Sequence, residues 1–231
     1  MICQKGWFME FIARTASFVT RGLGLPPASS VPLKYGQIRT MEEFLSVAPM
    51  PLASNGERVS VDLGCGRNPR NPLGCERLFG LDIEADPGAN VLAVDLFVSP
   101  LPFGNQSVDV VTAYDFLEHV PRCAITAEGT RFPFIDLMSE VVRILKPGGL
   151  FFSKTPAYPF SSAFVDPTHV NVITEDTFPS YFCCDSHYPQ ASRYGFKGEF
   201  KLVRQRWWGR GLGTSLLCLL QKAGPSCPPI A

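Results

Sequence analysis

The sequence of 231 residues has no excess of charge of either sign. Lys and Arg together number 21, as do Asp and Glu, so the formal net charge is zero. A protein that holds a long polyanion presents many basic side chains to its phosphates. Duplex nucleic acid is therefore not expected as a partner. Charged residues are also few, at 18% against 45% apolar residues, and this balance excludes a disordered chain.

Long apolar runs and paired cysteines are lacking as well. No apolar run reaches the roughly 18 to 20 residues that cross a bilayer. Eight cysteines are present, but none stands in a C-x-x-C spacing, so a zinc ribbon or finger is not indicated. A chain of this length can fold without disulfides, and scattered cysteines favour free thiols in a reducing compartment. The sequence therefore predicts a cytoplasmic protein.

The amino-terminal segment lacks the continuous apolar core of a secretion signal. Glu10 and Arg14 interrupt it, and its aromatic and aliphatic residues recur at helical spacing over residues 7–22. This pattern predicts an amphipathic helix that packs on the domain or caps its active site. Peripheral contact with a membrane through the same residues is the alternative.

A second short helix is expected further along the same segment. Thr40 and Glu43 have the spacing of a capping box, which predicts a helix that continues to about Val47. Together the two helices would make residues 1–50 an N-terminal helical cap. The remaining residues, 51–231, are expected to form one α/β domain.

From Arg58 onward, short apolar runs alternate with turn residues. Strands are predicted over residues 58–63, 77–83, 90–94, 107–114, 150–153, 199–206 and 214–221. A helix is predicted over Phe134–Leu145, and it should stop at Lys146-Pro147-Gly148-Gly149 because proline and glycine cannot continue it. Runs that are apolar on both faces, with helices between them, describe a parallel sheet covered on both sides.

Turn residues and carboxylates stand where these strands end. Gly64-Cys65-Gly66 follows the first strand directly, and glycines there let a ligand approach the backbone closely. The third glycine of the dinucleotide fingerprint is missing. Asp82 ends the second strand, where a carboxylate can accept both ribose hydroxyl protons. Asp95 ends the third strand and could take the exocyclic amine of a purine. The sequence thus predicts a crevice for a nucleoside-containing ligand.

Further motifs follow in order along the chain: Leu101-Pro102-Phe103, Ser107-Val108-Asp109-Val110-Val111, Leu117-Glu118-His119-Val120 and Leu145-Lys146-Pro147-Gly148-Gly149. With the glycine turn and the two carboxylates, the sequence resembles the class I S-adenosylmethionine-dependent methyltransferases, and most of all the small-molecule methyltransferase domain 11 group. The resemblance covers about residues 58–155. It implies a Rossmann-like, doubly wound sheet of seven strands whose last strand is antiparallel, formed by the two carboxyl-terminal runs.

The resemblance also implies S-adenosylmethionine as the cofactor and a role for each motif residue. The methionine part would lie along the glycine turn, Asp62 would hydrogen-bond within that loop, and Asp82 would hold the ribose. The other contacts would be Gly64, Cys65 and Gly66 along the methionine, Ile83, Asp95 and Leu96 at the adenine, and Tyr114 and Asp115 beside the sulfonium. One stretch departs from the pattern: residues 68–74 contain two prolines and a glycine, so the first crossover helix is expected to be short or irregular.

Methyl transfer from a sulfonium needs the nucleophile, the methyl carbon and the sulfur held in line. A hydroxyl acceptor also benefits from a base, and histidine suits that task near neutral pH. His119 follows the fourth strand closely, and His169 lies in the segment that lines the acceptor site in the resembling family. Both are candidates for the base or for an acceptor contact, and ordinary loop histidines are the alternative. His187 has no supporting context.

Metal assistance is a further alternative. Hard ligands are available in Asp115, Glu118, His119, Asp166 and His169. No spacing among these residues specifies a metal, so none is predicted. Asp115 and Glu118 are also candidates for fixing a histidine or the cofactor.

The acceptor site is expected in an insertion at about residues 156–194. The region from Phe151 to Tyr194 is rich in aromatic residues and poor in charge, which suits a neutral or partly apolar acceptor. The sequence therefore predicts an O-methyltransferase that acts on a small molecule or on a glycan- or lipid-linked acceptor. Methylation of RNA or protein is one alternative, and a non-catalytic partner that keeps the fold is another. The retained Asp82, Asp95 and glycine turn disfavour the second.

Overall fold

The computed structural model describes residues 32–50, 56–184, 189–210 and 213–224. The chain divides into two compact units, residues 1–34 and 35–231, and the described helices and strands all lie in the second. The amphipathic helix expected over residues 7–22 and His187 fall outside the described residues. Among the residues that are described, none of the helices combines the length and the apolar character needed to span a membrane.

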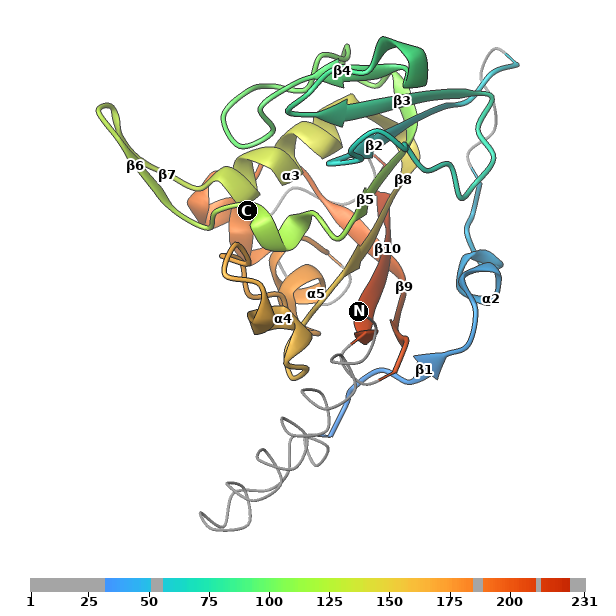
Figure 1. Cartoon of the computed structure of the whole chain (residues 1–231), viewed down its shortest axis with the longest axis vertical. Helices are drawn as coiled ribbons and strands as arrows, with labels where there is room; N and C mark the ends of the chain where they lie inside the picture. The colour runs from blue at the N-terminus through green and yellow to red at the C-terminus, as the bar shows by residue number, and fades with distance from the viewer. Residues whose placement is uncertain (1–31, 51–55, 185–188, 211–212, 225–231) are drawn as a thin grey trace, which may run out of the picture. The chain divides into compact units, whose positions relative to one another are not determined.

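An eight-stranded sheet forms the centre of the second unit, in the order β1-β9-β10-β8-β5-β2-β3-β4 (Figure 1). The strands are β1 Gln37–Ile38, β2 Val59–Leu63, β3 Arg77–Asp82, β4 Val91–Ala93, β5 Val108–Tyr114, β8 Leu145–Thr155, β9 Phe200–Trp208 and β10 Ser215–Lys222. β10 runs antiparallel to both of its neighbours, and every other adjacent pair is parallel. The seven predicted strands and the antiparallel last strand are confirmed. The eighth strand, β1, was not predicted, because two residues are too few to show an alternating pattern.

The strand β8 is longer than its predicted extent. β8 begins at Leu145, directly after the helix, so Lys146-Pro147-Gly148-Gly149 lies within the strand and not in a turn before it. The register between β5 and β8 shifts after the pair Val108–Leu145, and Gly148 has a φ of 76° there. Glycine tolerates this conformation, which lets the strand continue past an irregularity.

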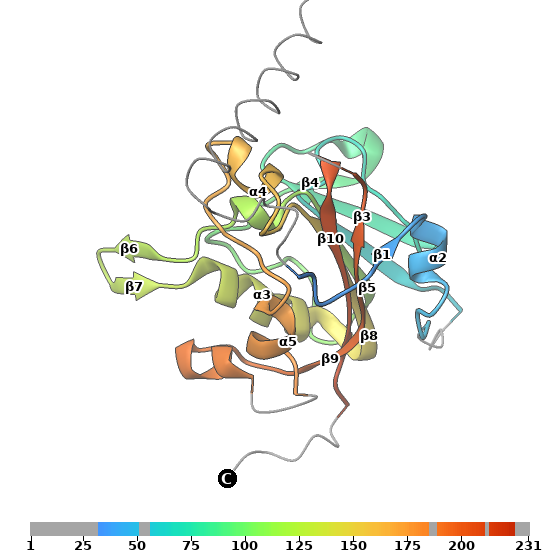
Figure 2. The same ribbon diagram turned by 90° about the horizontal axis from the view of Figure 1, so that it is seen from below.

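The remaining elements are short, apart from one helix. α3 spans Pro133–Ile144, one residue from the predicted bounds at each end. The other helices are α2 Met41–Leu45, α4 Ser162–Val165, α5 Thr177–Tyr181 and the 3-10 turns η2 Pro87–Ala89, η3 Leu117–His119 and η4 Gln190–Tyr194. β6 Ala124–Thr126 and β7 Gly129–Arg131 form a separate hairpin that projects from the sheet (Figures 1 and 2).

The two faces of the sheet are covered unequally. α3 and α5 pack on one face, where Met138, Val141 and Phe178 are buried with the strands. The other face is covered by α2 and by the loop after β2, and Figure 2 shows α2 on the side of the sheet away from α3. The predicted helices between strands are therefore largely missing on this face. The crossover from β2 to β3, which the structure describes in full over residues 64–76, contains no helix. A short or irregular helix was expected there, and the structure has an irregular loop in its place.

α2 begins as its sequence predicts and ends two residues early. The hydroxyl of Thr40 accepts a hydrogen bond from the backbone N–H of Glu43 at 3.1 Å. Phe44 is fully buried, and its ring lies 5.7 Å from that of Phe152 on β8. Arg204 on β9 donates to the carbonyl oxygens of Glu43 and Phe44, at 2.8 and 3.2 Å. These contacts fix α2 on the sheet.

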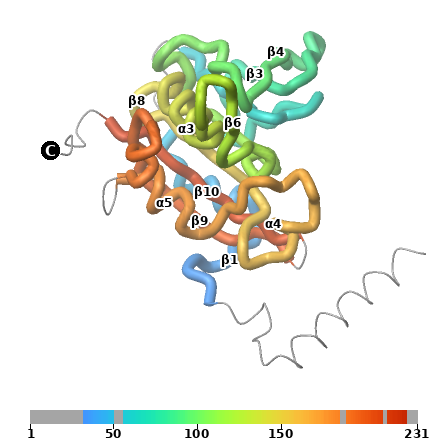
Figure 3. Tube along the Cα trace, turned by 90° about the vertical axis from the view of Figure 1, so that its left-hand side faces the viewer, coloured from blue at the N-terminus to red at the C-terminus, as the bar shows by residue number. Residues whose placement is uncertain are grey.

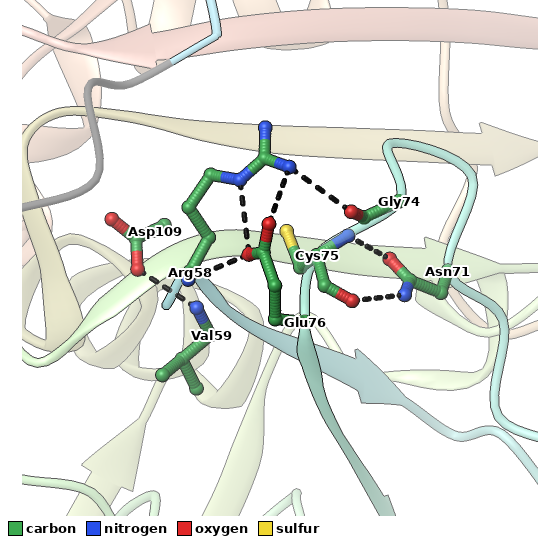
Figure 4. Close-up of polar contacts among 7 residues, drawn as sticks. All are labelled: Arg58, Val59, Asn71, Gly74, Cys75, Glu76 and Asp109. Atoms are coloured by element: carbon green, nitrogen blue, oxygen red, sulfur yellow. Dashed lines mark hydrogen bonds and ion pairs between the residues drawn. The ribbon is translucent and has the colours of Figure 1, made fainter. Parts of the chain in front are cut away.

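A polar network joins the amino-terminal ends of the strands (Figure 4). The fully buried carboxylate of Asp109 accepts hydrogen bonds from the backbone N–H of Val59 at 2.8 Å and from Lys146 Nζ at 2.9 and 2.8 Å. Arg58 pairs with Glu76 at 2.9 Å beside it. Because these groups lie at the end of the sheet opposite to the glycine turn, the motif residues Asp109 and Lys146 have a structural role.

The insertion after β8 is anchored to β9. The carboxylate of Glu175 accepts hydrogen bonds from the indole N–H of Trp207 at 2.7 Å and from the backbone N–H of Tyr35 at 3.0 Å. Its main-chain carbonyl accepts from the side-chain amide of Gln205 at 2.7 Å. In Figure 3 the strands β9 and β1 lie at the side of the sheet away from β3 and β4. The predicted acceptor segment is thus held on the lateral side of the sheet that β1 and β9 form. The glycine turn follows β2, near the other lateral side.

Candidate functional site

The glycine turn after β2 is closely packed at one end and open at the other. Gly64 and Gly66 have φ angles of 62° and 59°, in the left-handed region that favours glycine. The backbone N–H of Gly64 donates to the carbonyl oxygen of Leu81 at 2.8 Å. A Cβ on Gly64 would lie 2.2 Å from the ring of Phe116, whereas a Cβ on Gly66 would meet no atom within 4 Å. The turn therefore offers open backbone at Gly66.

Asp82 at the end of β3 is tied to this turn. Its Oδ2 accepts a hydrogen bond from the backbone N–H of Gly66 at 2.7 Å, and its Oδ1 accepts one from Ile83 at 2.8 Å. Each carboxylate oxygen can accept a second hydrogen bond, so ribose hydroxyls can still bind here. The side chain of Ile83 is 67% exposed. A large apolar side chain left open beside a carboxylate fits a flat, partly apolar ligand such as adenine.

The segment after β4 continues the same edge of the sheet. The backbone N–H of Val94 donates to the carbonyl oxygen of Asp82 at 2.7 Å, which holds the two strand ends together. Asp95 is exposed, and its Oδ1 accepts a hydrogen bond from the backbone N–H of Phe97 at 3.0 Å. Leu96 is buried. The carboxylate of Asp95 is therefore accessible to a ligand, whereas the side chain of Leu96 packs beneath the turn that follows β4.

Asp62 lies beneath the turn. It is fully buried, and its carboxylate accepts hydrogen bonds from the hydroxyl of Thr112 at 2.6 Å and from the backbone N–H of Arg70 at 2.8 Å. Burial raises the pKa of Asp62 to about 6, against the lowering effect of these two hydrogen bonds. The side chain thus fixes the irregular loop that replaces a crossover helix.

Tyr114 ends β5 and Asp115 follows it, and their side chains contact different partners. The Tyr114 ring packs on Phe152, with centroids 5.2 Å apart, and the guanidinium of Arg70 lies 4.5 Å from its centre. Asp115 has a φ of 49° and forms an ion pair with Lys154 of β8, whose Nζ lies 2.6 Å from Oδ1. Arg70 and Lys154 were not among the predicted site residues. Sequence spacing does not reveal the contact of Arg70 with Tyr114 or that of Lys154 with Asp115.

Three further groups gather directly after β5. Glu118 on η3 is buried, and its Oε2 accepts a hydrogen bond from the hydroxyl of Thr155 at 2.7 Å. Burial raises the pKa of this carboxyl. The rings of His119 and His169 meet edge to face, with centroids 4.9 Å apart. The structure therefore brings together the two histidines that the sequence analysis selected, 50 residues apart.

The contacts of His119 determine its tautomer. The hydroxyl of Thr168 donates to Asp166 Oδ1 at 2.6 Å, so its oxygen can only accept from other groups. His119 Nδ1 lies 3.0 Å from this oxygen and 3.3 Å from the Thr168 carbonyl oxygen. Both contacts require a proton on Nδ1, which leaves the lone pair of a neutral imidazole on Nε2. Thr168, which the sequence analysis did not select, thus orients His119; the Asp-x-Thr spacing was its only signal.

Phe116 links the histidine cluster to the glycine turn. It packs on Gly64 and directly precedes η3, and its ring stacks on that of Phe97 with centroids 6.2 Å apart. The glycine turn, the end of β3 and the histidine pair therefore border one edge of the sheet, where the parallel strands end. Ligands bind at this edge in open α/β sheets.

A cavity of about 560 Å³ is lined by residues of α3, α5, η4 and the segments on either side of the β6–β7 hairpin. Much of its lining is aromatic, from Phe132, Phe134, Tyr181, Phe182 and Tyr194. Arg122 also lines it and donates through Nε to the Oδ1 of Asn171 at 2.7 Å. The backbone N–H of Asn171 in turn donates to the carbonyl oxygen of Glu118 at 2.9 Å. One hydrogen-bonded chain therefore connects the cavity wall with the histidine cluster.

Comparison with known proteins identifies the fold that carries this site. The methyltransferase domain family, Methyltransf_11, matches residues 61–153. No curated protein matches the chain. Among solved structures, a chain of the complex between the Haloferax volcanii Trm112 methyltransferase activator and a methyltransferase is 20% identical, with a TM-score of 0.50; 79% of this chain and 89% of that chain align. A Bacillus halodurans protein described as a methyltransferase is 12% identical with a TM-score of 0.51, over 79% of this chain and 98% of that one. The predicted Rossmann-like methyltransferase fold is confirmed.

Proposed function

Residues 61–153 form a class I methyltransferase domain that uses S-adenosylmethionine, and on that premise we propose that the chain methylates a hydroxyl group. The acceptor is a small molecule or a glycan- or lipid-linked molecule. The observation that carries the proposal is the pair of His119 and His169, with rings 4.9 Å apart and His119 oriented through Thr168. A neutral amine attacks through its lone pair before it loses a proton, whereas a hydroxyl is a weak nucleophile until a base takes its proton.

The cofactor contacts proposed for this chain follow the edge of the sheet. Gly66 offers open backbone to the methionine part, Asp82 offers carboxylate oxygens to the ribose, and the exposed Ile83 offers an apolar surface to the adenine. Asp95 offers an accessible carboxylate at the next strand end. Gly64, Cys65, Asp62 and Leu96 support these groups from beneath. Tyr114 and Asp115 border the sulfonium.

The histidine pair is placed to activate the acceptor. The bound cofactor supplies an electrophilic methyl group, so that the C–O bond forms as the C–S bond breaks and S-adenosylhomocysteine leaves. The chain holds the acceptor oxygen in line with that bond. One imidazole of the pair, His119 or His169, accepts the hydroxyl proton. The cavity that a hydrogen-bonded chain joins to this cluster has the aromatic lining that suits an apolar ring or the face of a sugar.

Transfer of labelled methyl groups tests the proposal. The chain is incubated with methyl-labelled S-adenosylmethionine and host extract, and small molecules, lipids and glycans, protein and RNA are counted separately. We expect label in small molecules, lipids or glycans, on an oxygen atom. Label in RNA or protein, or on nitrogen, would overturn the proposed acceptor, and the absence of label from every fraction would overturn the enzymatic function.

Asp82→Ala supplies the blank for this experiment. The substitution removes the carboxylate proposed to hold the ribose, and we expect the affinity for S-adenosylmethionine, measured by calorimetry, to fall at least about tenfold, the loss of one charge-assisted contact. Glu84→Ala is the matched control, because Glu84 is an exposed acid two residues away. Equal affinities of the two variants would contradict the placement of the ribose. Circular dichroism checks that Asp82→Ala folds, since Asp82 also bonds the glycine turn.

A further inference from the structure

Glu118, His119 and His169 converge on one point. One ligand atom from each of them lies within 4.8 Å of the other two. The residues come from η3 and from the loop after α4, so the fold and not the local sequence brings them together. Donor atoms about 2.0 to 2.2 Å from a tetrahedral or octahedral cation lie roughly 3 to 3.6 Å apart, so the three side chains would close slightly further around the ion.

Two atoms of this cluster are buried without a partner among the described residues. They are Oε1 of Glu118 and Nδ1 of His169. Buried polar atoms in folded proteins are nearly always hydrogen-bonded, so each exception calls for an explanation. Both atoms carry a lone pair when the carboxylate is ionised and the imidazole is protonated on Nε2. Two unpartnered acceptors side by side indicate a positively charged ligand that the chain itself does not supply.

The surroundings hold the donor groups in a fixed geometry. The second oxygen of Glu118 is occupied by the hydroxyl of Thr155. His119 donates its Nδ1 proton to Thr168, which leaves Nε2 as its ligand atom. Histidines that bind metals usually donate their other ring N–H to an oxygen in this way. The nearby cation Lys154 is paired with Asp115 and does not contact Glu118 in the described structure.

We propose that Glu118, His119 and His169 bind one divalent transition-metal cation. A set of one carboxylate and two imidazoles suits Mn²⁺, Fe²⁺, Co²⁺ or Zn²⁺, whereas Mg²⁺ and Ca²⁺ prefer oxygen ligands throughout. The sequence analysis predicted no metal, because the two histidines are 50 residues apart and Glu118 and His119 are adjacent. Neither spacing matches a local metal-binding motif.

The cation gives the proposed hydroxyl activation a mechanism, and this part of the inference rests on the proposed function. Three protein ligands leave coordination positions open, as in catalytic metal sites. The acceptor hydroxyl takes one of them, and the cation lowers its pKa. The proton passes to solvent water, the oxygen bonds the methyl carbon, and the C–S bond breaks with release of S-adenosylhomocysteine. The imidazoles then act as ligands, and proton transfer to them is not required.

Binding of Mn²⁺ to the full chain tests the site without cofactor or acceptor. The protein is stripped with a chelator, and free Mn²⁺ is measured by electron paramagnetic resonance during titration. We expect one Mn²⁺ per chain, and at least tenfold weaker binding by Glu118→Gln and by His169→Asn. Glu84→Gln is the matched control, because Glu84 is an exposed acid outside the cluster. Equal binding by all four proteins, or no binding by the wild type, would overturn the proposal.

A second measurement covers variants that fail to fold. The chain has three histidines, so their ring protons give few signals in an NMR spectrum. Substoichiometric Mn²⁺ should broaden the two signals that substitution assigns to His119 and His169. If these two signals stay sharp, the site is contradicted.

The two proposals can fail separately. If Mn²⁺ binds but no label is transferred, the proposed function is wrong and the cation site stands. If label transfer depends on Asp82 but Mn²⁺ does not bind, the cation site is wrong and the proposed function stands. Asp82→Ala should bind Mn²⁺ as the wild type does, because Asp82 is outside the cluster.

Discussion

Gly64 and Gly66 have the same backbone conformation but different surroundings. Both φ angles are near 60°, and only Gly64 is packed against Phe116. Gly66→Ala should therefore lower the free energy of unfolding by about 1 to 2 kcal/mol, the cost of a left-handed alanine. Gly64→Ala should cost a further 1 to 3 kcal/mol, roughly, because its Cβ overlaps the Phe116 ring. Urea denaturation measures both. Equal losses would contradict the packing of Phe116 on the turn.

Asp62 predicts a specific dependence of stability on pH. Its pKa is raised by burial from 3.8 to about 6 in the folded chain, so the folded state holds the proton more tightly than the unfolded state. The stability that this group contributes is therefore full below about pH 3.8, falls as the pH rises towards 6, and is constant above that. We expect the free energy of unfolding of the wild type, relative to Asp62→Asn, to fall by roughly 2 to 3 kcal/mol over this range.

Glu57→Gln serves as the control for this measurement. Glu57 is exposed, and its removal changes the charge by the same amount without touching the glycine turn. Denaturation is followed in urea at several pH values between 4 and 7. If the curve of Asp62→Asn runs parallel to that of the wild type, the buried carboxylate does not titrate as proposed.

At the scale of elements, α3 depends on a contact from a distant strand. Lys222 at the end of β10 donates from Nζ to the carbonyl oxygens of Val142 and Leu145, each at 2.7 Å. These carbonyls belong to the carboxyl end of the helix, where the helix dipole favours a cation. Lys222→Met keeps the aliphatic stem and removes the donor. We expect it to lower the free energy of unfolding by about 1 to 2 kcal/mol.

Lys201→Met is the control for the contact between Lys222 and the carboxyl end of α3. Lys201 is exposed on β9 and is the register partner of Gln221, next to Lys222 in β10. Its loss changes the net charge equally and should leave stability within about 0.5 kcal/mol of the wild type. The helical signal in circular dichroism, followed through thermal unfolding, reports on both variants. A similar loss in the two would show that charge, and not the cap on α3, is responsible.

At the scale of the whole molecule, the sequence predicted the sheet better than its covering. Apolar runs that end in turn residues located the strands β2 to β5 and β8 to β10, and helical spacing located α3 within one residue. The β6–β7 hairpin was not predicted. The sequence predicted only in part that helices would be absent from the crossovers between strands. Two prolines and a glycine predicted the irregular loop after β2, whereas the segments around β4 contain no equally strong signal. β1 pairs with β9 through tertiary contacts that no local pattern carries.

The site residues that lie at strand ends could be predicted from the sequence. The contacts made by residues in the loops could not. Asp82 and the glycine turn lie at strand ends, so their meeting follows from the geometry of a parallel sheet. The meeting of His119 with His169 depends on the path of the insertion, and so do the contacts of Thr168. The approach of Phe116 to Gly64 depends on the reversal at Asp115. These roles require coordinates, since the partners are far apart along the chain or joined by an uncommon backbone conformation.

The strand order also has a consequence for how the molecule comes to be assembled. β9 reaches the remainder of the sheet only through β10, which the ribosome makes after it. Strands β2 to β5, with the glycine turn and Asp82, are complete and mutually paired much earlier in synthesis. Glu175 holds the acceptor segment to Trp207 and Gln205 of β9, so the anchor of that segment on the sheet is complete only when β10 emerges. A nascent chain is thus expected to gain cofactor affinity before it gains an acceptor site, because non-local pairing of late strands completes last.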